Sequence, residues 1–189
     1  MRKFSIIVVA AFHSFSTGAV AVDAIDCSTL PTWSATVSGY QVNLHHVFCG
    51  EKGKKTRAKG FHSTPGGKTP STYQSSTMDS RPNAAGVYVL KNIQLTIGSV
   101  TYNKGFSSMF PISCSQAQVT QSIAYSHANN TGSCASPGWA QCGPSAPSGG
   151  DRSAYCVGDD GSSFTIASAL LRKTNKINTG FPIYIAPKR

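Results

Sequence analysis

The sequence predicts an α+β domain that has more strand than helix and is stabilised by disulfides. Three observations support this prediction. Several short runs are rich in β-branched and aromatic residues, which favour strands. One segment combines a capping residue with apolar residues one turn apart, which favours a helix. The chain also contains six cysteines, and an even number of cysteines in an exported protein is typical of disulfide bonds.

Residues 1–21 have the pattern of a secretory signal peptide. The positive start Met1–Lys3 precedes the apolar run Phe4–Phe12, and Ala19–Ala21 offers small residues for cleavage. The apolar run is too short to span a membrane. A buried N-terminal strand is the alternative interpretation. We therefore expect a secreted or periplasmic protein in which residues 22–189 form a single domain.

The first half of this domain is expected to begin with irregular segments. Residues 22–44 are expected to be an irregular N-terminal segment. Residues 45–70 form a compact basic segment, and residues 71–85 are a polar loop rich in Ser, Thr and Pro. Runs of β-branched and aromatic residues follow, which predict strands. These runs are residues 86–90, 93–97 and 100–102.

The second half is expected to contain the helix and the last strands. Ser115 can cap a helix over about residues 116–127, in which Val119 and Ile123 lie one turn apart. Residues 129–161 are rich in Gly, Ser, Pro and Cys, and we interpret them as an insertion held in place by its cysteines. Residues 164–166 and 181–185 are predicted as strands, with Pro182 indicating an edge or a bulge.

The charge balance excludes some functions. The chain has 17 Lys+Arg but only 7 Asp+Glu, which gives a formal net charge of +10. So few carboxylates argue against a Ca²⁺ or Mg²⁺ site built from clustered acids and against a glycosidase that uses two carboxylates. The basic excess indicates a polyanionic partner, which is nucleic acid, anionic lipid or a cell-wall polymer.

The cysteines are expected to form disulfides, and the sequence leaves their pairing open. A zinc site is the alternative, but the chain has neither a C-x-x-C nor an H-E-x-x-H motif. Cys49 also lies close to His46 in the chain, so a Cys–His pair in which Cys49 acts as a nucleophile is a further alternative.

Histidines and lysines are concentrated in the basic segment. His45, His46 and His62 lie there among several lysines. Two imidazoles in a cationic loop suit acid–base chemistry on a phosphodiester, because the ordinary histidine pKa is about 6.5. One would remove the proton of a ribose 2′-OH and the other would protonate the leaving 5′ oxygen. The alternative is a solvated basic surface loop.

Four motifs occur in order along the chain: HVFCGE at 46–51, KGFHS at 59–63, KGFSSMFP at 104–111 and TGFP at 179–182. Together they resemble the EndoU-type endoribonucleases, a family that includes bacterial toxin domains and the coronavirus uridylate-specific endoribonuclease. The resemblance spans about residues 43–128 and 162–187. It implies an EndoU/RNase A-like fold of antiparallel β-sheets with a few short helices.

The resemblance also implies roles for individual residues. His62 matches the general base, His46 the general acid and Lys104 the third catalytic residue. Gly60 would present its backbone N–H to the phosphate. Ser108 and Thr179 match positions that read the uracil edge and support the catalytic groups.

One position departs from the family pattern, and at other positions a neighbouring residue is an alternative candidate for the same role. Phe181 stands where the family often has tyrosine, so it can stack on a base or ribose but cannot donate a hydrogen bond. Ser107 competes with Ser108 as the polar group of its motif. His45 is expected to be structural, and His127 is expected to interact with the helix C-terminus.

The function implied is a secreted, metal-independent endoribonuclease that cleaves single-stranded RNA to a 2′,3′-cyclic phosphate. The family suggests uridine preference, tRNA as one target, a toxin role and a cognate immunity protein. No cofactor is expected to be required, although Mn²⁺ stimulates some relatives. The alternatives are a cationic binding protein for anionic envelope polymers and a hydrolase that depends on Cys49.

Overall fold

The structure is a computed structural model and describes residues 24–187. The predicted signal peptide, residues 1–21, lies outside the described residues. None of the helices in residues 24–187 is long and apolar enough to cross a membrane.

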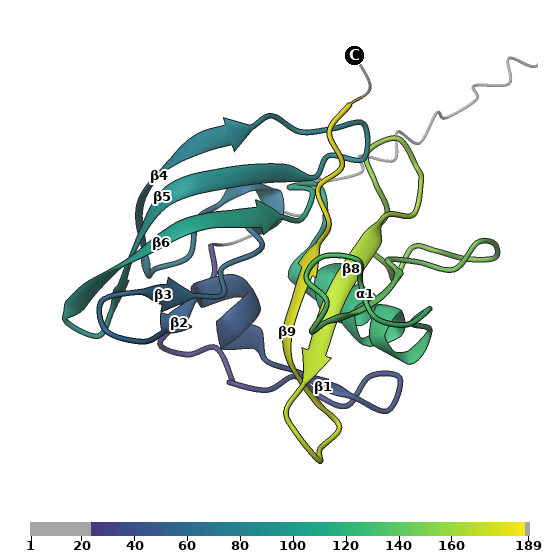
Figure 1. Cartoon of the computed structure of the whole chain (residues 1–189), viewed down its shortest axis with the longest axis horizontal. Coiled ribbons are helices and arrows are strands. Elements are labelled where there is room, and N and C mark those ends of the chain that lie inside the picture. Colours follow the sequence, from purple (N-terminus) through teal and green to yellow (C-terminus); the bar gives the residue numbers. More distant parts are fainter. Residues whose placement is uncertain (1–23, 188–189) are drawn as a thin grey trace, which may run out of the picture.

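Two mainly antiparallel sheets dominate the fold (Figure 1). The first contains three strands in sequence order: β4 (Tyr73–Ser80), β5 (Tyr88–Ile97) and β6 (Val100–Met109). The second contains four strands in the order β1 (Gln41–Val42), β9 (Lys176–Pro182), β8 (Thr165–Leu170) and β7 (Gln141–Pro144). Within these two sheets, the short β1–β9 pair is parallel and the other pairs are antiparallel. The prediction of an α+β fold is confirmed.

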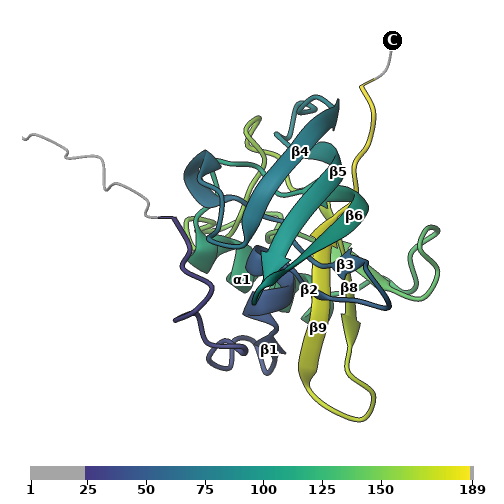
Figure 2. The same cartoon turned by 90° about the vertical axis from the view of Figure 1, so that its left-hand side faces the viewer.

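The remaining elements are short, except for one helix. A π-helical turn covers His45–Cys49 and a 3₁₀ turn covers Pro65–Gly67. Strands β2 (Glu51–Lys52) and β3 (Ala58–Lys59) form a separate hairpin that lies below β6 in both views (Figure 1, Figure 2). Helix α1 (Gln116–Ala128) packs against β7 and β8.

The helix begins where the sequence predicted it. The Ser115 side chain accepts a hydrogen bond from the backbone N–H of Gln118, and the Gln118 side chain accepts one from the backbone N–H of Ser115. This capping box satisfies two amide donors that the first turn would otherwise leave unpaired. Val119 and Ile123 are fully buried against the four-stranded sheet, which confirms the apolar face of the helix.

The strand predictions in the first half need correction. Residues 73–80 form strand β4, although the segment 71–85 was predicted to be a loop. β4 is an edge strand with mostly exposed side chains, so it carries no apolar alternation for a sequence pattern to detect. Residues 88–90 and the run 93–97 belong to one strand, β5, and the pairing with β4 and β6 continues on both sides of Asn92, which has a positive φ of 51°.

Two buried clusters lie side by side and meet at the two histidine motifs. One cluster joins α1 to the four-stranded sheet and includes Val47 and Phe48 of the π-helical turn. The other lies under the three-stranded sheet and includes Phe61. His46 and His62 are neighbours of these residues in sequence, so each histidine is anchored in a different cluster. Their relative position therefore depends on the packing of both sheets.

All six cysteines are paired, as predicted. The disulfides are Cys27–Cys49, Cys114–Cys156 and Cys134–Cys142. The first ties the N-terminal segment to the π-helical turn, and the third closes a loop within the predicted insertion. Because Cys49 is in a disulfide, it has no thiol to act as a nucleophile, and the alternative of a Cys49-dependent hydrolase is wrong.

Candidate active site

A cleft of about 1150 Å³ runs between β6 and β9 and gathers every site residue predicted from the sequence. These residues are His46, Gly60, His62, Lys104, Ser108, Thr179 and Phe181. They come from the π-helical turn, the segment after β3, strand β6 and strand β9.

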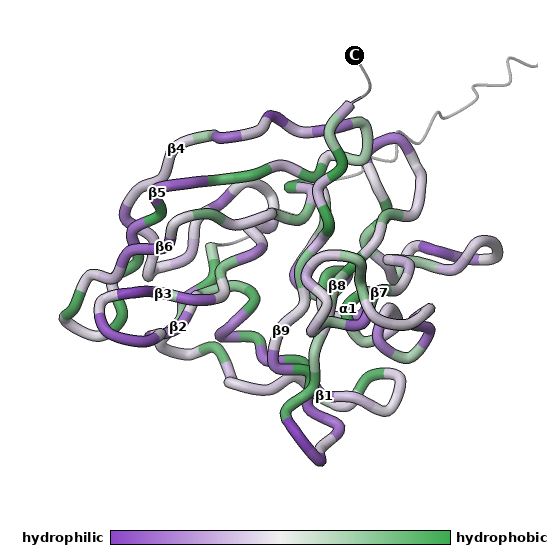
Figure 3. Tube along the Cα trace, in the orientation of Figure 1, coloured by the Kyte–Doolittle hydropathy of each residue, from purple (hydrophilic) through white to green (hydrophobic). Residues whose placement is uncertain are grey.

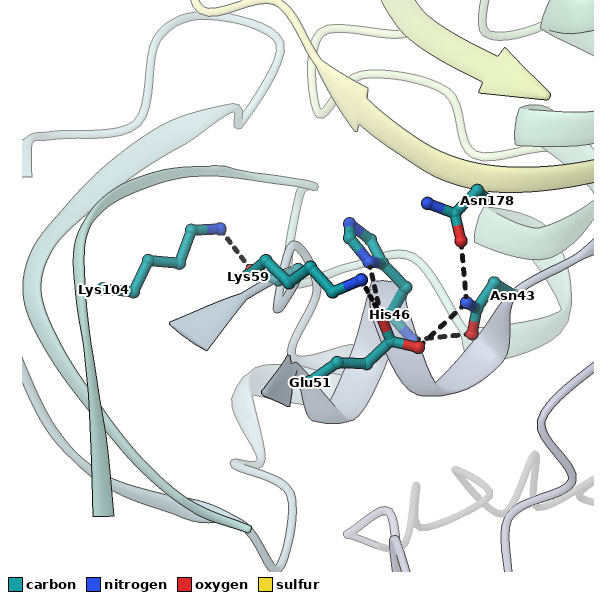
Figure 4. Close-up of polar contacts among 7 residues, drawn as sticks. Asn43, His46, Glu51, Lys59, Lys104 and Asn178 are labelled. Carbon is teal, nitrogen blue, oxygen red and sulfur yellow. Dashed lines mark hydrogen bonds and ion pairs between the residues drawn. The ribbon is translucent and has the colours of Figure 1, made fainter. Parts of the chain in front are cut away.

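His46 is held by a carboxylate on one side of its ring. Its Nδ1 lies 3.0 Å from Oε2 of Glu51, and Lys59 approaches the same oxygen at 3.2 Å (Figure 4). A carboxylate oxygen accepts hydrogen bonds, so Nδ1 carries the proton. Nε2 is on the far side of the ring and faces the cleft. The carboxylate thus sets the orientation and the tautomer of the imidazole.

A pair of asparagines holds that carboxylate in place. Asn43 Nδ2 donates to Oε1 of Glu51 at 2.9 Å, and Asn43 Oδ1 accepts from the backbone N–H of His46 at 2.9 Å. Asn178 of β9 accepts a longer bond from Asn43 Nδ2 at 3.3 Å (Figure 4). Burial alone would raise the pKa of Glu51, but hydrogen bonds from His46, Asn43 and Lys59 outweigh it and lower the pKa to about 2. Glu51 is therefore a permanent anion at neutral pH.

His62 has a different environment. Its Nδ1 lies 3.0 Å from the carbonyl oxygen of Ser108 and 2.9 Å from Oγ of Ser107. A carbonyl only accepts, and the Ser107 hydroxyl already donates to the carbonyl of Phe61 at 2.6 Å, so Nδ1 is the donor to both. This arrangement leaves the Nε2 lone pair of the neutral ring free to accept a proton.

The two imidazoles differ in how readily they are protonated. Burial lowers the pKa of His62 well below 6.5, and the positive charges of Lys104 and His46 lower it further. Burial also lowers the pKa of His46, but the hydrogen bond and the charge of Glu51 offset part of that effect. The ring centroids are 5.9 Å apart. Two nearby groups with different proton affinities are what paired acid–base catalysis requires.

Lys104 points from β6 into the space beside both histidines. Its Nζ donates to the carbonyl of Gly60 and, at 2.9 Å, to Oγ of Ser107. Burial lowers the pKa of Lys104 to about 7, because an ammonium group loses its hydration there. An anionic phosphate in the cleft would favour the charged form.

This geometry can be compared with known families. The sequence profile of the bacterial EndoU nucleases matches residues 41–184, which is most of the chain. The chain belongs to this family. No curated protein and no solved structure gave a significant match. Membership of the EndoU nucleases supports an endoribonuclease role in general terms. The matched range includes every residue of the cleft discussed above.

Gly60 shows why the EndoU motif has glycine before its second histidine. Gly60 has a φ of +75°, and a Cβ at this position would overlap the carbonyl oxygen of His46. The backbone amides of Phe61 and His62 donate to the carbonyls of His46 and Val47, both at 2.6 Å. The absence of a side chain lets the two histidine segments approach this closely.

Gly60→Ala is expected to lower both stability and activity. The new methyl group would force the two segments apart, and we expect the free energy of unfolding to fall by about 2 kcal/mol or more. Gly98→Ala is the matched control, because Gly98 also has a positive φ of +62° but has open space within 4 Å of the point where a Cβ would lie. Gly98→Ala should lower the free energy of unfolding by only about 1 kcal/mol. Denaturant melts and RNA cleavage assays compare the two, and equal effects would contradict this explanation.

Aromatic residues flank the candidate catalytic groups of this EndoU chain. Phe181 stacks on His62 with ring centroids 5.1 Å apart and an interplanar angle of 24°. Trp139 lies 6.1 Å from Phe181, and its side chain is 64% exposed. One face of Phe181 is therefore covered by His62, while Trp139 presents a large free surface to the cleft. Trp139 was not predicted; the only signal for it is an aromatic residue inside the loop closed by Cys134–Cys142.

The structure also places the competing residues. Both serines line the cleft. Ser107, and not Ser108, contributes its hydroxyl to the bonds with Lys104 and His62, whereas Ser108 contributes its carbonyl to His62. His45 lies outside the cleft lining, and its Nε2 contacts the carbonyl of Leu30 at 2.6 Å. His127 is buried and its Nδ1 contacts Oγ of Ser168 at 2.8 Å.

The residues that orient His46 were only partly visible in the sequence. Glu51 occupies the acidic position of the first motif, but the sequence did not indicate that it holds Nδ1 of His46. Asn43 and Asn178 carried no signal, because they are far apart in the chain and meet only through the pairing of β1 with β9. In residues 24–187 no cluster of three or more His, Cys, Asp or Glu side chains is placed to hold a metal ion.

Proposed function

We propose that the protein is an endoribonuclease that cleaves single-stranded RNA by 2′-O transesterification, without a required metal or other cofactor. The products are a 2′,3′-cyclic phosphate and a 5′-OH end. The observation that carries this proposal is the arrangement of the two imidazoles. Each has its Nδ1 proton engaged by the protein, and each has its Nε2 available to a substrate in the cleft.

The reaction moves one proton at each of the two imidazoles. His62, which is neutral at pH 7, accepts the proton of the 2′-OH at Nε2 as the 2′ oxygen bonds to phosphorus. His46, in its protonated form, donates the Nε2 proton to the 5′ oxygen as the bond between phosphorus and that oxygen breaks. Glu51 stabilises the protonated form of His46 through the bond to Nδ1. Charge and atoms balance without any further reactant.

Negative charge that develops on the phosphate oxygens needs a partner in the cleft. The Lys104 ammonium supplies it from a partly buried site in the cleft, where an ion pair is stronger than in bulk water. Gly60 also lines the cleft, and its backbone amide would be a second donor to the phosphate.

The direct test is digestion of a fluorescent uridine-containing RNA and of its all-DNA analogue in the presence of EDTA. We expect cleavage of the RNA only, cyclic-phosphate ends, and no cleavage by the His62→Ala variant. DNA is expected to resist because it lacks the 2′-OH nucleophile. Cleavage of both substrates, or no cleavage of any RNA with or without Mn²⁺, would overturn the proposal.

The pH profile of kcat/KM is expected to be bell-shaped with an acidic optimum. His62 must be neutral, and its pKa is held well below 6.5, so activity rises at low pH as His62 loses its proton. His46 must be protonated, and its pKa is also below 6.5, so activity falls as pH rises further. Lys104 loses its charge near pH 7 and steepens this fall. Initial rates across about pH 4 to pH 9 test this, and a rate that keeps rising above pH 7 would contradict it.

The biological setting belongs to the same proposal. The disulfides are consistent with an extracellular or periplasmic location, and the N-terminal pattern predicts secretion. We propose a secreted toxin with uridine preference, with tRNA as a candidate target and with an immunity protein in the producing cell. Because Phe181 has no hydroxyl, recognition of the base falls to Ser108, Thr179 and the exposed ring of Trp139.

A further inference from the structure

The cleft extends past the catalytic groups to a surface that the proposed reaction does not use. Its lining includes Arg57 and Lys59 of the β2–β3 hairpin and Asn103 and Phe106 of β6. None of these residues is needed to move a proton or to neutralise a single phosphate at the centre described above. We call the hairpin cations and Phe106 together the hairpin surface: Lys52, Lys54, Lys55, Arg57, Lys59 and Phe106.

The hairpin carries a strong positive charge. Its five cations are all exposed, and Figure 3 colours the hairpin mainly purple, which marks hydrophilic residues. The only carboxylate of the hairpin is Glu51, which already pairs with His46 and Lys59. Among the described residues, Lys54, Lys55 and Arg57 make no ion pair. Cations left unpaired at close spacing repel one another, which indicates an anionic partner.

The hairpin is anchored, so the cations are presented in a fixed place. Ala58 is buried with the core of the three-stranded sheet. The backbone N–H of Asn103 donates to the carbonyl of Thr56 at 3.1 Å, which joins the hairpin turn to β6. Within the turn, the N–H of Gly53 donates to the carbonyl of Arg57 at 2.8 Å. Arg57 and Lys59 therefore line one wall of the cleft, and Lys52, Lys54 and Lys55 are exposed on the same anchored hairpin, outside that lining.

Phe106 is the feature that distinguishes a nucleic acid from other polyanions. Its side chain is 71% exposed, although it lies on a strand beside the catalytic Lys104. A phenyl ring left in water next to cations has no packing function, but it can stack on a base. Alternation of cations and exposed aromatic rings is typical of surfaces that bind single-stranded RNA.

We infer that the hairpin surface binds the RNA strand on one side of the scissile phosphate, with Lys54, Lys55 and Arg57 contacting phosphates and Phe106 stacking on a base. This rests on the proposed function, since it deepens the description of the same substrate. It assigns the protein a substrate longer than the nucleotides that react. Affinity should then grow with RNA length, and loss of the surface should affect long substrates more than short ones.

The test measures binding separately from cleavage. Fluorescence anisotropy would record the Kd of wild type for a 2′-O-methyl RNA of about 12 nucleotides and for one of about 3, neither of which can react. We expect the variant with Lys54→Ser, Lys55→Ser and Arg57→Ser to bind the longer strand about 10- to 100-fold more weakly at low salt. Its slope of log K against log salt should be smaller by about 2. Phe106→Ala should weaken binding about fivefold or more without changing that slope.

The matched control removes the same charge elsewhere. Lys68, Arg172 and Lys173 are exposed and lie neither in the cleft lining nor on the β2–β3 hairpin, so their triple replacement by serine should leave Kd for the longer strand within about threefold of wild type. Equal losses in the hairpin and control variants would overturn the inference, as would equal losses for both strand lengths or no effect of Phe106→Ala. If wild type binds as expected but cleaves no RNA, the inference stands and the proposed reaction fails.

Discussion

RNA with sulfur in place of the leaving 5′ oxygen is expected to be cleaved well by His46→Ala and poorly by His62→Ala. With ordinary RNA, each substitution should lower kcat/KM by about 10²- to 10⁴-fold, the usual contribution of a general acid or base. A thiolate is a much weaker base than an alkoxide and leaves without being protonated. The sulfur substrate therefore removes the need for the acid but not for the base.

Single-turnover cleavage of both substrates by the two variants measures this difference. On the sulfur substrate, the cleavage rate of His46→Ala should return to within about tenfold of the wild-type rate, whereas the rate of His62→Ala should stay low. Recovery of His62→Ala alone would show that the acid and the base are the reverse of our assignment. His45→Ala is the matched control, because His45 neighbours His46 in the chain but lies outside the cleft lining. Its kcat/KM should stay within about threefold of wild type.

Lys104→Met is expected to lower activity greatly without lowering stability. Methionine has a similar length and no charge, so the variant loses the ammonium group that faces the phosphate. Removal of one such group typically costs about 10²- to 10³-fold in rate. Burial has already lowered the pKa of Lys104 to about 7, which means that the folded protein is destabilised by holding this charge. An apolar side chain removes that cost.

The stability difference between the two proteins should depend on pH in a defined direction. From about pH 7 to the ordinary lysine pKa of 10.5, the unfolded chain binds more protons at this residue than the folded chain does. The stability of wild type therefore rises with pH in this range relative to Lys104→Met, and any advantage of the variant is largest below pH 7. Urea melts at several pH values test this. Lys91→Met is the control, since Lys91 is paired with Asp79 at 2.9 Å outside the cleft lining and its loss should leave cleavage unchanged.

Local patterns were sufficient for the elements whose structure is decided within one turn or one strand. Ser115 followed by Val119 and Ile123 predicted helix α1, because a cap and an apolar stripe are properties of adjacent turns. The same kind of pattern could not find β4. Its residues are polar on both faces, and only pairing with β5 makes them a strand.

The catalytic candidates came from motif spacing, and their partners came from the fold. His46, His62 and Lys104 were chosen because their motifs match the EndoU family, to which the chain belongs. Three features of the same cleft came only from the structure: the asparagine pair that holds Glu51, the choice of Ser107 over Ser108 as the hydroxyl between Lys104 and His62, and the exposed ring of Trp139. Each depends on contacts between segments more than 30 residues apart in the chain or on the path of a disulfide-closed loop.

The sequence by itself determined the class of the fold, the presence of disulfides and the residues that would meet in the site. Composition and local patterns indicate the fold class and the disulfides, because they reflect which side chains can be buried and whether the cysteines are even in number. The site residues came from the motifs that match the EndoU family. The tertiary structure decided the disulfide pairing, the tautomer of each histidine and the difference in their proton affinities. Those properties arise from burial and from hydrogen bonds across the cleft, where the two sheets bring His46 and His62 to 5.9 Å from each other.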